Sequence, residues 1–195
     1  MIAPRRSRNA HHFQRLYDAS LDPWQFRSSE YERAKYRTTI ASLGGEHFRS
    51  GFEVGCSIGE LTCMLAGYCD ALLAVDIVEA PLRAARGVCA EQPWVRFAQM
   101  EVPRQWPDDV FDLIVLSEVL YFLSPEDIIR VADRAADTLE PQGKVLLVNW
   151  RGRTDDPCTG DQAAAIFIER VRNWLSPRLQ YSEGSAYRLD LLSCR

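Results

Sequence analysis

The stretch that decides the fold is Phe52-Glu53-Val54-Gly55-Cys56-Ser57-Ile58-Gly59-Glu60-Leu61-Thr62. An acidic residue sits in a short apolar run, glycines occupy positions 55 and 59, and an apolar-periodic segment follows. This order predicts a strand, a glycine loop and a helix. Because glycine permits positive φ and lets ligand atoms approach the backbone, the loop predicts a site for a small ligand with anionic or ribose groups.

Outward from the loop, short apolar runs alternate with amphipathic segments. We expect strands at 51–54, 72–75, 95–98, 111–116, 144–150, 179–183 and 187–192, and helices at 61–67, 80–90, 125–139 and 161–175. Pro81 is expected in a first helical turn and Ser124 at an N-cap, and residues 140–143 read as a turn. The alternation predicts βαβ units. The expected fold class is therefore α/β, a Rossmann-like and mostly parallel seven-stranded sheet with helices on both faces.

The segment before the strand at 51–54 is dense in aromatic residues. Residues 1–10 read as a mobile basic tail, and the histidines that follow read as its solvated end. A helix is expected over 30–43, capped by Ser28 or Ser29. Two interpretations stay open for this segment: its aromatic side chains anchor it to the main fold, or it is a lid that covers a bound cofactor. In the second, the covering residues are Trp24, Arg27 and Tyr31.

Composition narrows the function classes. A formal net charge of −4 argues against a nucleic-acid partner. The best apolar run, 113–123, is short and contains Glu118, so no membrane span is expected. The first eight residues carry arginines without an apolar core, and no secretory signal is predicted. Six cysteines without paired metal spacing predict reduced, mostly buried thiols, no metal site and a cytoplasmic protein.

Three known motifs compete for the glycine loop. Residues 55–59 match G-x-S-x-G, the nucleophile elbow of serine hydrolases, but all three histidines precede Ser57 whereas that fold places the base after the serine. The dinucleotide fingerprint fails at two of its three glycines, where Ser57 and Glu60 stand. The S-adenosylmethionine loop, (D/E)-x-G-x-G-x-G, fits Glu53, Gly55 and Gly59 and departs only at Ser57.

The positions around the loop fit S-adenosylmethionine as well. Glu53 is placed to attract the cofactor's ammonium group. Asp76 ends the second expected strand, where a carboxylate accepts both ribose hydroxyls. The positions beyond these strand ends complete the candidate cofactor site, with adenine expected near the end of the third strand: Ile77, Met100, Glu101 and Ser117.

Residues 51–150 resemble a class I S-adenosylmethionine-dependent methyltransferase, with the N-terminal segment as a helical lid. The run Asp22-Pro23-Trp24-Gln25-Phe26-Arg27, together with Gly55-Cys56-Ser57-Ile58-Gly59, is similar to the rhizobial nodulation protein S family. The resemblance implies N-methylation of the non-reducing glucosamine of a deacetylated chitooligosaccharide in Nod-factor synthesis, with S-adenosylhomocysteine as product. The length predicts a single domain over 1–195, which comprises a cap or lid at 1–45, a cofactor-binding core at 46–150 and a last helix and strands at 151–195. A monomer is favoured.

The sequence predicts the residues that would bind the methyl acceptor less specifically than those that would bind the cofactor. Glu118 follows the fourth expected strand and is the candidate base for the attacking amine, although it equally fits a residue that only braces the loop or the adenine. Tyr121 either binds the amine or packs in the core. The candidate wall for a sugar is Trp150, Arg151, Asp155 and Asp156, with an ordinary surface loop as the alternative. A methyltransferase for another small acceptor, a hydrolase using Ser57 and a cofactor-binding sensor remain alternatives.

Overall fold

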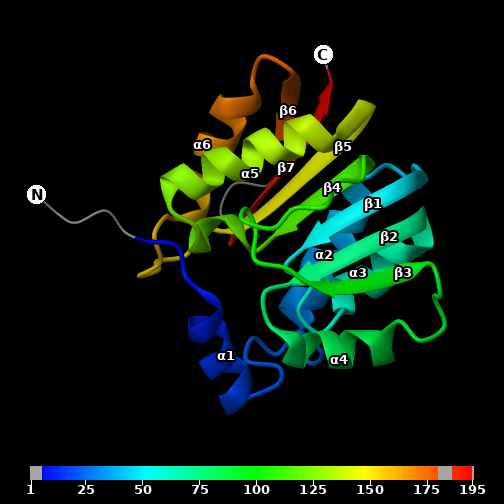
Figure 1. Ribbon diagram of the computed structural model, residues 1–195, viewed down its shortest axis with the longest axis vertical. Helices are drawn as coiled ribbons and strands as arrows, with labels where there is room; N and C mark the ends of the chain where they lie inside the picture. Colours follow the sequence, from blue (N-terminus) through cyan, green and yellow to red (C-terminus); the bar gives the residue numbers. More distant parts are fainter. Residues whose placement is uncertain (1–5, 180–185, 195) are drawn as a thin grey trace, which may run out of the picture. The chain divides into compact units, whose positions relative to one another are not determined.

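The computed structural model describes residues 6–179 and 186–194 (Figure 1). Its chain divides into two compact units. The N-terminal unit is Asn9–Glu101, and the C-terminal unit is Val102–Arg195 together with the residues up to Arg8. The single domain predicted for 1–195, with its internal boundaries at 45 and 150, stays a prediction.

The N-terminal unit is a three-stranded parallel sheet with helices. Its elements are α1 (Ala10–Ala19), α2 (Glu30–Ser42), β1 (Phe48–Val54), α3 (Glu60–Leu65), the 3-10 turn η1 (Ala66–Tyr68), β2 (Cys69–Asp76), α4 (Glu79–Val88) and β3 (Val95–Gln99). The strand order is β3-β2-β1. Because Val54 is in register with Val75, and Asp76 with Gln99, the loops after the three strands leave the same edge of this sheet. That edge is where open α/β sheets bind ligands.

Local sequence explains most of these elements. β1 and β2 each end in a run of buried residues, as expected of strands covered on both faces. Oγ of Ser29 accepts the Glu32 N–H at the start of α2, so the predicted cap is confirmed. The prediction of a tail over residues 1–10 is wrong at its described end, since Ala10 begins α1 and the Asn9 side chain caps it.

The C-terminal unit is a four-stranded sheet of order β4-β5-β7-β6. Its elements are β4 (Phe111–Ser117), the 3-10 turn η2 (Leu120–Phe122), α5 (Pro125–Thr138), β5 (Leu139–Trp150), α6 (Gly160–Val171), β6 (Leu175–Leu179) and β7 (Tyr187–Cys194). β4 and β5 are parallel, whereas β7 is antiparallel to both β5 and β6. Helices α5 and α6 pack beside each other (Figure 1). Ser124 caps α5 as predicted, accepting the N–H of Asp127.

Three predictions in this unit are wrong. The helix predicted over 161–175 ends at Val171, and β6 begins at Leu175, so the strand predicted at 179–183 starts too late; residues 180–183 lie outside the described ones. The turn predicted at 140–143 lies within β5. Leu139 is nonetheless in register with Phe111 and Lys144 with Leu113, so four residues of β5 bulge opposite one residue of β4.

The described helices include none with the length and apolar character needed to span a bilayer. All six cysteines are free thiols, and four of them are buried, as predicted.

Candidate functional site

The glycine loop after β1 has a left-handed residue at every second position. Gly55, Ser57 and Gly59 have φ of 79°, 47° and 85°. The carbonyl oxygen of Val75 accepts the N–H groups of both Gly55 and Cys56, at 2.8 and 3.0 Å, which fastens the loop to β2. At Gly59 a Cβ atom would stand 2.8 Å from Cβ of Ala85, so glycine also lets the start of α3 approach α4 closely.

Ser57 replaces the middle glycine of the motif, and two contacts hold its strained backbone. Left-handed conformation at a non-glycine residue costs about 1 to 3 kcal/mol. The Ser57 N–H donates to Oδ2 of Asp76 at 3.0 Å. Its Oγ accepts a 2.7 Å hydrogen bond from the hydroxyl of Tyr17 on α1. Sequence reasoning missed Tyr17 as a site residue; its one signal was an amphipathic pattern over 10–19, in which Tyr17 is the buried position.

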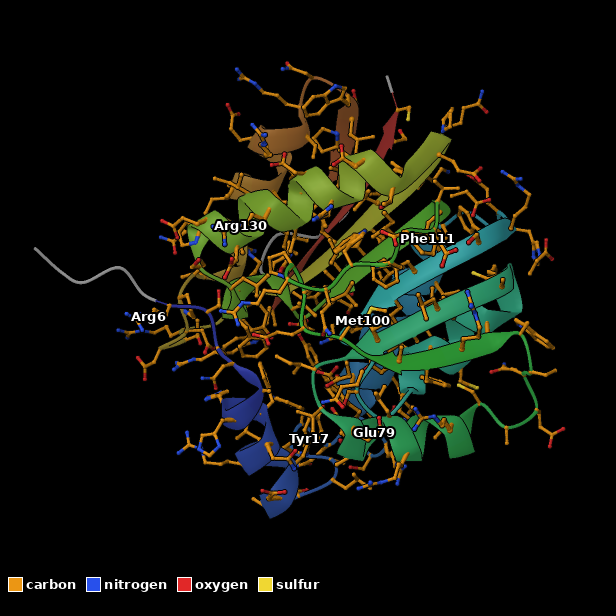
Figure 2. The ribbon with its side chains drawn as sticks, viewed as in Figure 1. Arg6, Tyr17, Glu79, Met100, Phe111 and Arg130 are labelled. Carbon is orange, nitrogen blue, oxygen red and sulfur yellow. The ribbon has the colours of Figure 1, made fainter. Side chains whose placement is uncertain are left out.

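Asp76 gathers the ends of β2 and β3 around the loop. Its Oδ1 accepts the Val78 N–H at 3.0 Å, and burial raises the pKa of the carboxyl to about 6. The Met100 N–H donates to the carbonyl of Asp76 at 2.9 Å (Met100 and Tyr17 are labelled in Figure 2). The Gln99 side chain donates to the carbonyl of Ile77 at 3.0 Å. Four predicted cofactor residues are thus brought together here: Ser57, Asp76, Ile77 and Met100; Glu101 follows Met100.

Glu53 is a buried acid with an unused acceptor. It is 2% exposed, and its Oε2 has no hydrogen-bond partner among the described residues. Burial raises its pKa to about 7. A buried carboxylate oxygen without a partner is costly, and a cationic ligand group is a partner of the right charge for it.

The three residues predicted to cover the cofactor lie in different surroundings. The Trp24 ring stacks on Phe26, with ring centres 5.5 Å apart, and meets Tyr17 edge-on at 5.7 Å. Arg27 Nε lies 3.5 Å from Oε1 of Glu60, the residue after Gly59. These contacts bring Trp24 and Arg27 to the loop. Tyr31, 40% exposed on α2, instead carries the Lys35 ammonium over its ring at 5.4 Å.

Glu118 is the centre of a second polar group, in the C-terminal unit. Its φ is 58°, again left-handed, and its N–H donates to the carbonyl of Val148 at 2.8 Å. One carboxylate oxygen, Oε2, accepts from the Tyr121 hydroxyl at 2.8 Å and from the Trp150 N–H at 3.0 Å. The structure therefore joins Glu118, Tyr121 and Trp150. Ser117, 8% exposed, ends β4 opposite Val148.

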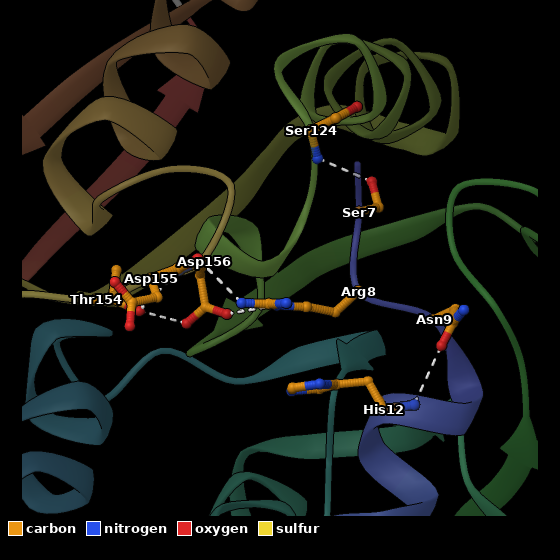
Figure 3. A network of polar contacts seen from close by, with 8 residues as sticks. All are labelled: Ser7, Arg8, Asn9, His12, Ser124, Thr154, Asp155 and Asp156. Atoms are coloured by element: carbon orange, nitrogen blue, oxygen red, sulfur yellow. Dashed lines mark hydrogen bonds and ion pairs between the residues drawn. The ribbon is translucent and has the colours of Figure 1, made fainter. Parts of the chain in front are cut away.

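The four residues predicted to form a wall for a sugar make separate contacts. A Cβ atom on Gly152 would fall 1.9 Å from the Trp150 indole, so the ring lies against the Gly152 backbone while remaining 37% exposed. Arg151 Nε pairs with Asp161 of α6 at 3.1 Å. Asp155 and Asp156 are bound by Arg8 (Figure 3).

The geometry around Ser57 disfavours a nucleophilic role. Its Oγ bonds the Tyr17 hydroxyl, and no described histidine bonds to it. His47 pairs instead with the exposed Asp70 at 2.8 Å. A serine without a base has no efficient route for losing its proton.

Comparison with known proteins agrees with this geometry. The family model described as Nodulation protein S (NodS) matches residues 7–154. The chain belongs to the nodulation protein S family. Nodulation protein S of Sinorhizobium fredii is 29% identical over 140 residues, covering 71% of this chain and 65% of the relative. That of Bradyrhizobium diazoefficiens is 32% identical over 103 residues, covering 52% and 49%. These matches span about half to two thirds of the relatives' own length.

Solved structures show the fold. A crystal structure of a candidate methyltransferase from Pseudomonas syringae has a TM-score of 0.73 at 36% identity and covers 85% of this chain and 99% of that one. The N-methyltransferase NodS of Bradyrhizobium japonicum, in complex with S-adenosyl-L-homocysteine, has a TM-score of 0.78 at 21% identity, covering 96% and 99%. The predicted family and the predicted fold class, a Rossmann-like class I methyltransferase, are confirmed.

Proposed function

We propose that this protein is an S-adenosylmethionine-dependent N-methyltransferase that acts on the free amine of the non-reducing glucosamine of a deacetylated chitooligosaccharide. The observation that carries the proposal is the glycine loop, fastened to Asp76 through Ser57 and placed beside a buried, unpartnered Glu53 oxygen. Membership of the nodulation protein S family supports it, as does the solved structure of the N-methyltransferase NodS in complex with S-adenosyl-L-homocysteine.

The N-terminal unit supplies the groups that would hold the methyl donor. When bound, S-adenosylmethionine supplies a methyl group carried on a sulfonium. Glu53 would face its ammonium, because Oε2 has no partner in the described chain. Asp76 would accept the ribose hydroxyls with the lone pairs that the N–H groups of Ser57 and Val78 leave open. Met100 and Glu101 are assigned to the adenine, Ile77 remains a cofactor contact, and Trp24, Arg27 and Tyr31 are assigned as cover. Ser117, which lies in the C-terminal unit, stays a predicted cofactor contact.

In this proposal Arg27 would pair with the carboxylate of the cofactor. It already lies near Glu60, so it would bind the cofactor carboxylate by sharing its guanidinium between two acidic groups. Because the Arg27 side chain is about half exposed, its ion pair with Glu60 is weak. Sharing the guanidinium with the cofactor carboxylate would therefore cost little free energy.

Glu118 is the proposed base. An amine attacks only when it is neutral, so a carboxylate that takes its proton favours the reactive form. The Tyr121 hydroxyl and the Trp150 N–H fix the Glu118 carboxylate. Tyr121 would thus act by orienting Glu118, which is a more specific role than either alternative derived from sequence.

An exposed indole supports a sugar as the acceptor. Trp150 presents a flat apolar surface, backed by Gly152, of the kind that stacks on a pyranose ring. Arg151, paired with Asp161, adds hydrogen-bond donors beside it. Action as a monomer in the cytoplasm stays a prediction.

The test is incubation with S-adenosylmethionine labelled in its methyl group and two chitooligosaccharides, one deacetylated at its non-reducing end and one fully acetylated. We expect label in the first alone. Label in neither, with the cofactor still bound in calorimetry, would move the proposal to another small acceptor. Absence of cofactor binding would overturn it.

A further inference from the structure

Ser7 and Arg8, which precede the Asn9 cap of α1, form a strap on the C-terminal unit. Oγ of Ser7 accepts the Ser124 N–H at 2.8 Å and donates to Oδ2 of Asp127 at 2.5 Å. The Arg8 N–H donates to the carbonyl of Phe122, the last residue of η2, at 2.8 Å. Figure 3 shows Ser7 beside Ser124 and the Arg8 side chain extended toward Asp155 and Asp156. The strap is therefore tied to the start of α5 and to the end of η2.

The Arg8 side chain extends this attachment to the loop between β5 and α6. Its Nε lies 2.8 Å from Oδ1 of Asp156, and its terminal nitrogen donates to the carbonyl of Asp155 at 3.0 Å. The Asp156 carboxylate also accepts from Thr154 Oγ1, and its own N–H donates back to that oxygen at 3.2 Å. With its side chain 14% exposed, Asp156 is partly buried, so the pair is screened less than a surface ion pair.

The loop is also tied to the proposed base. The Cys158 N–H donates to the carbonyl of Tyr121 at 3.3 Å, and the Tyr121 hydroxyl donates to Glu118. Arg8 thus binds η2 through its backbone and the loop through its side chain. Tyr121, which orients Glu118, lies in η2 and is contacted by the loop. Arg8 therefore connects η2, which contains Tyr121, with the loop that donates to the Tyr121 carbonyl.

From this arrangement we infer that Arg8 is a positioning residue for methyl transfer, fixing the loop 151–159 against η2 and through it the Tyr121–Glu118 pair. The inference rests on the proposed function. It also changes the role of Asp156, from a predicted sugar ligand to the partner of Arg8. A small displacement of positioning groups lowers rates strongly, whereas the methyl-donor residues Glu53 and Asp76 lie in the other unit.

The test compares Arg8→Met, which keeps the side chain's length without its charge, with Arg6→Met as the matched control, since Arg6 is exposed. We expect Arg8→Met to lower kcat by roughly tenfold or more with the cofactor Kd unchanged, Arg8→Lys to restore part of the loss, and Arg6→Met to behave as the native chain. Native kinetics in Arg8→Met would overturn the inference.

A double-mutant cycle separates positioning from direct binding of the sugar by Asp156. If Asp156 acts through Arg8, then Asp156→Asn matches Arg8→Met and the double variant is no worse than either. Additive losses, or a larger KM increase in Asp156→Asn alone, would contradict the inference.

Hydrogen exchange keeps the inference testable if the native protein methylates no amino sugar. Arg8→Met should then still accelerate amide exchange over residues 151–159 while leaving residues 51–76 unchanged. Unaltered exchange in the loop would overturn the positioning role, whereas faster exchange without transfer activity would leave that role standing and reject only the proposed acceptor.

Discussion

The hydroxyl of Tyr17 donates a 2.7 Å hydrogen bond to Oγ of Ser57, a residue forty positions later in the chain. Burial, and next the nearby Asp76, raise the pKa of the Tyr17 hydroxyl, so it remains a donor across the physiological range. The bond ties α1 to the one position of the glycine loop where the general motif has a glycine and this chain does not.

Tyr17→Phe should therefore weaken binding of S-adenosylhomocysteine by roughly three- to tenfold, the range set by a net hydrogen bond of about 1 kcal/mol. Isothermal calorimetry measures it. Tyr68→Phe is the control, because it removes from the same unit a hydroxyl that does not bond Ser57. Equal affinities for the two variants would show that the Tyr17 contact plays no part in shaping the loop.

Two substitutions of Ser57 distinguish the cost of its left-handed backbone from the contribution of its hydroxyl. Glycine relieves the left-handed backbone, whereas alanine keeps the strain, and both lose Oγ. Ser57→Gly should be more stable than Ser57→Ala by about 1 kcal/mol in urea unfolding. Both variants should retain methyl transfer. Complete loss of activity in both would restore a direct chemical role for the serine.

Because the pKa of Glu53 is raised in the folded state, the free energy of unfolding should fall as the pH rises. An unfolded glutamate loses its proton near pH 4.5, whereas folded Glu53 holds its proton to about pH 7. Its stabilising contribution is complete below pH 4.5 and is lost as the pH rises through 7. The difference in unfolding free energy between Glu53→Gln and the native chain should therefore increase in favour of the variant from pH 4.5 to pH 7. Above pH 7 this difference should stay constant. The exposed Glu91→Gln is the control. A difference that does not vary with pH would contradict the shift.

Glu118→Gln should lower kcat by about a hundredfold or more while sparing affinity for S-adenosylhomocysteine. The amide oxygen still accepts a hydrogen bond from Tyr121, so the geometry is kept and only proton acceptance is lost. Glu126→Gln, an exposed change in the first turn of α5, is the control. Unchanged turnover would remove Glu118 from the mechanism.

The strands and the glycine loop could be predicted because hydrophobic period and glycine placement are local signals. Strand β6 was misplaced for a physical reason: it is the last strand in the order and contains Pro177, which a central strand would not tolerate. The overlong helix prediction at 161–175 followed an apolar pattern that the structure divides between α6 and β6.

The missed site residues depend on contacts between distant parts of the sequence. Arg8 and Asp156 are 148 positions apart, and no local pattern distinguishes Arg8 from the other arginines of a basic terminus. Tyr17 likewise gains its role only from the fold. Glu53 could be proposed from sequence because it belongs to the loop motif, and Asp76 because the apolar pattern ends the next strand there; the structure bonds Asp76 to the loop.

The central claim is transfer of a methyl group to the amino nitrogen of a sugar by a chain that holds the donor at Asp76. Tandem mass spectrometry of a chitooligosaccharide deacetylated at its non-reducing end, after incubation with the protein and S-adenosylmethionine, tests it most directly. We predict one added methyl group on the nitrogen of that terminal sugar, and none when Asp76→Ala replaces the native chain at low cofactor concentration. A methyl group on a sugar oxygen, or an unmodified sugar in the presence of bound cofactor, would contradict the account.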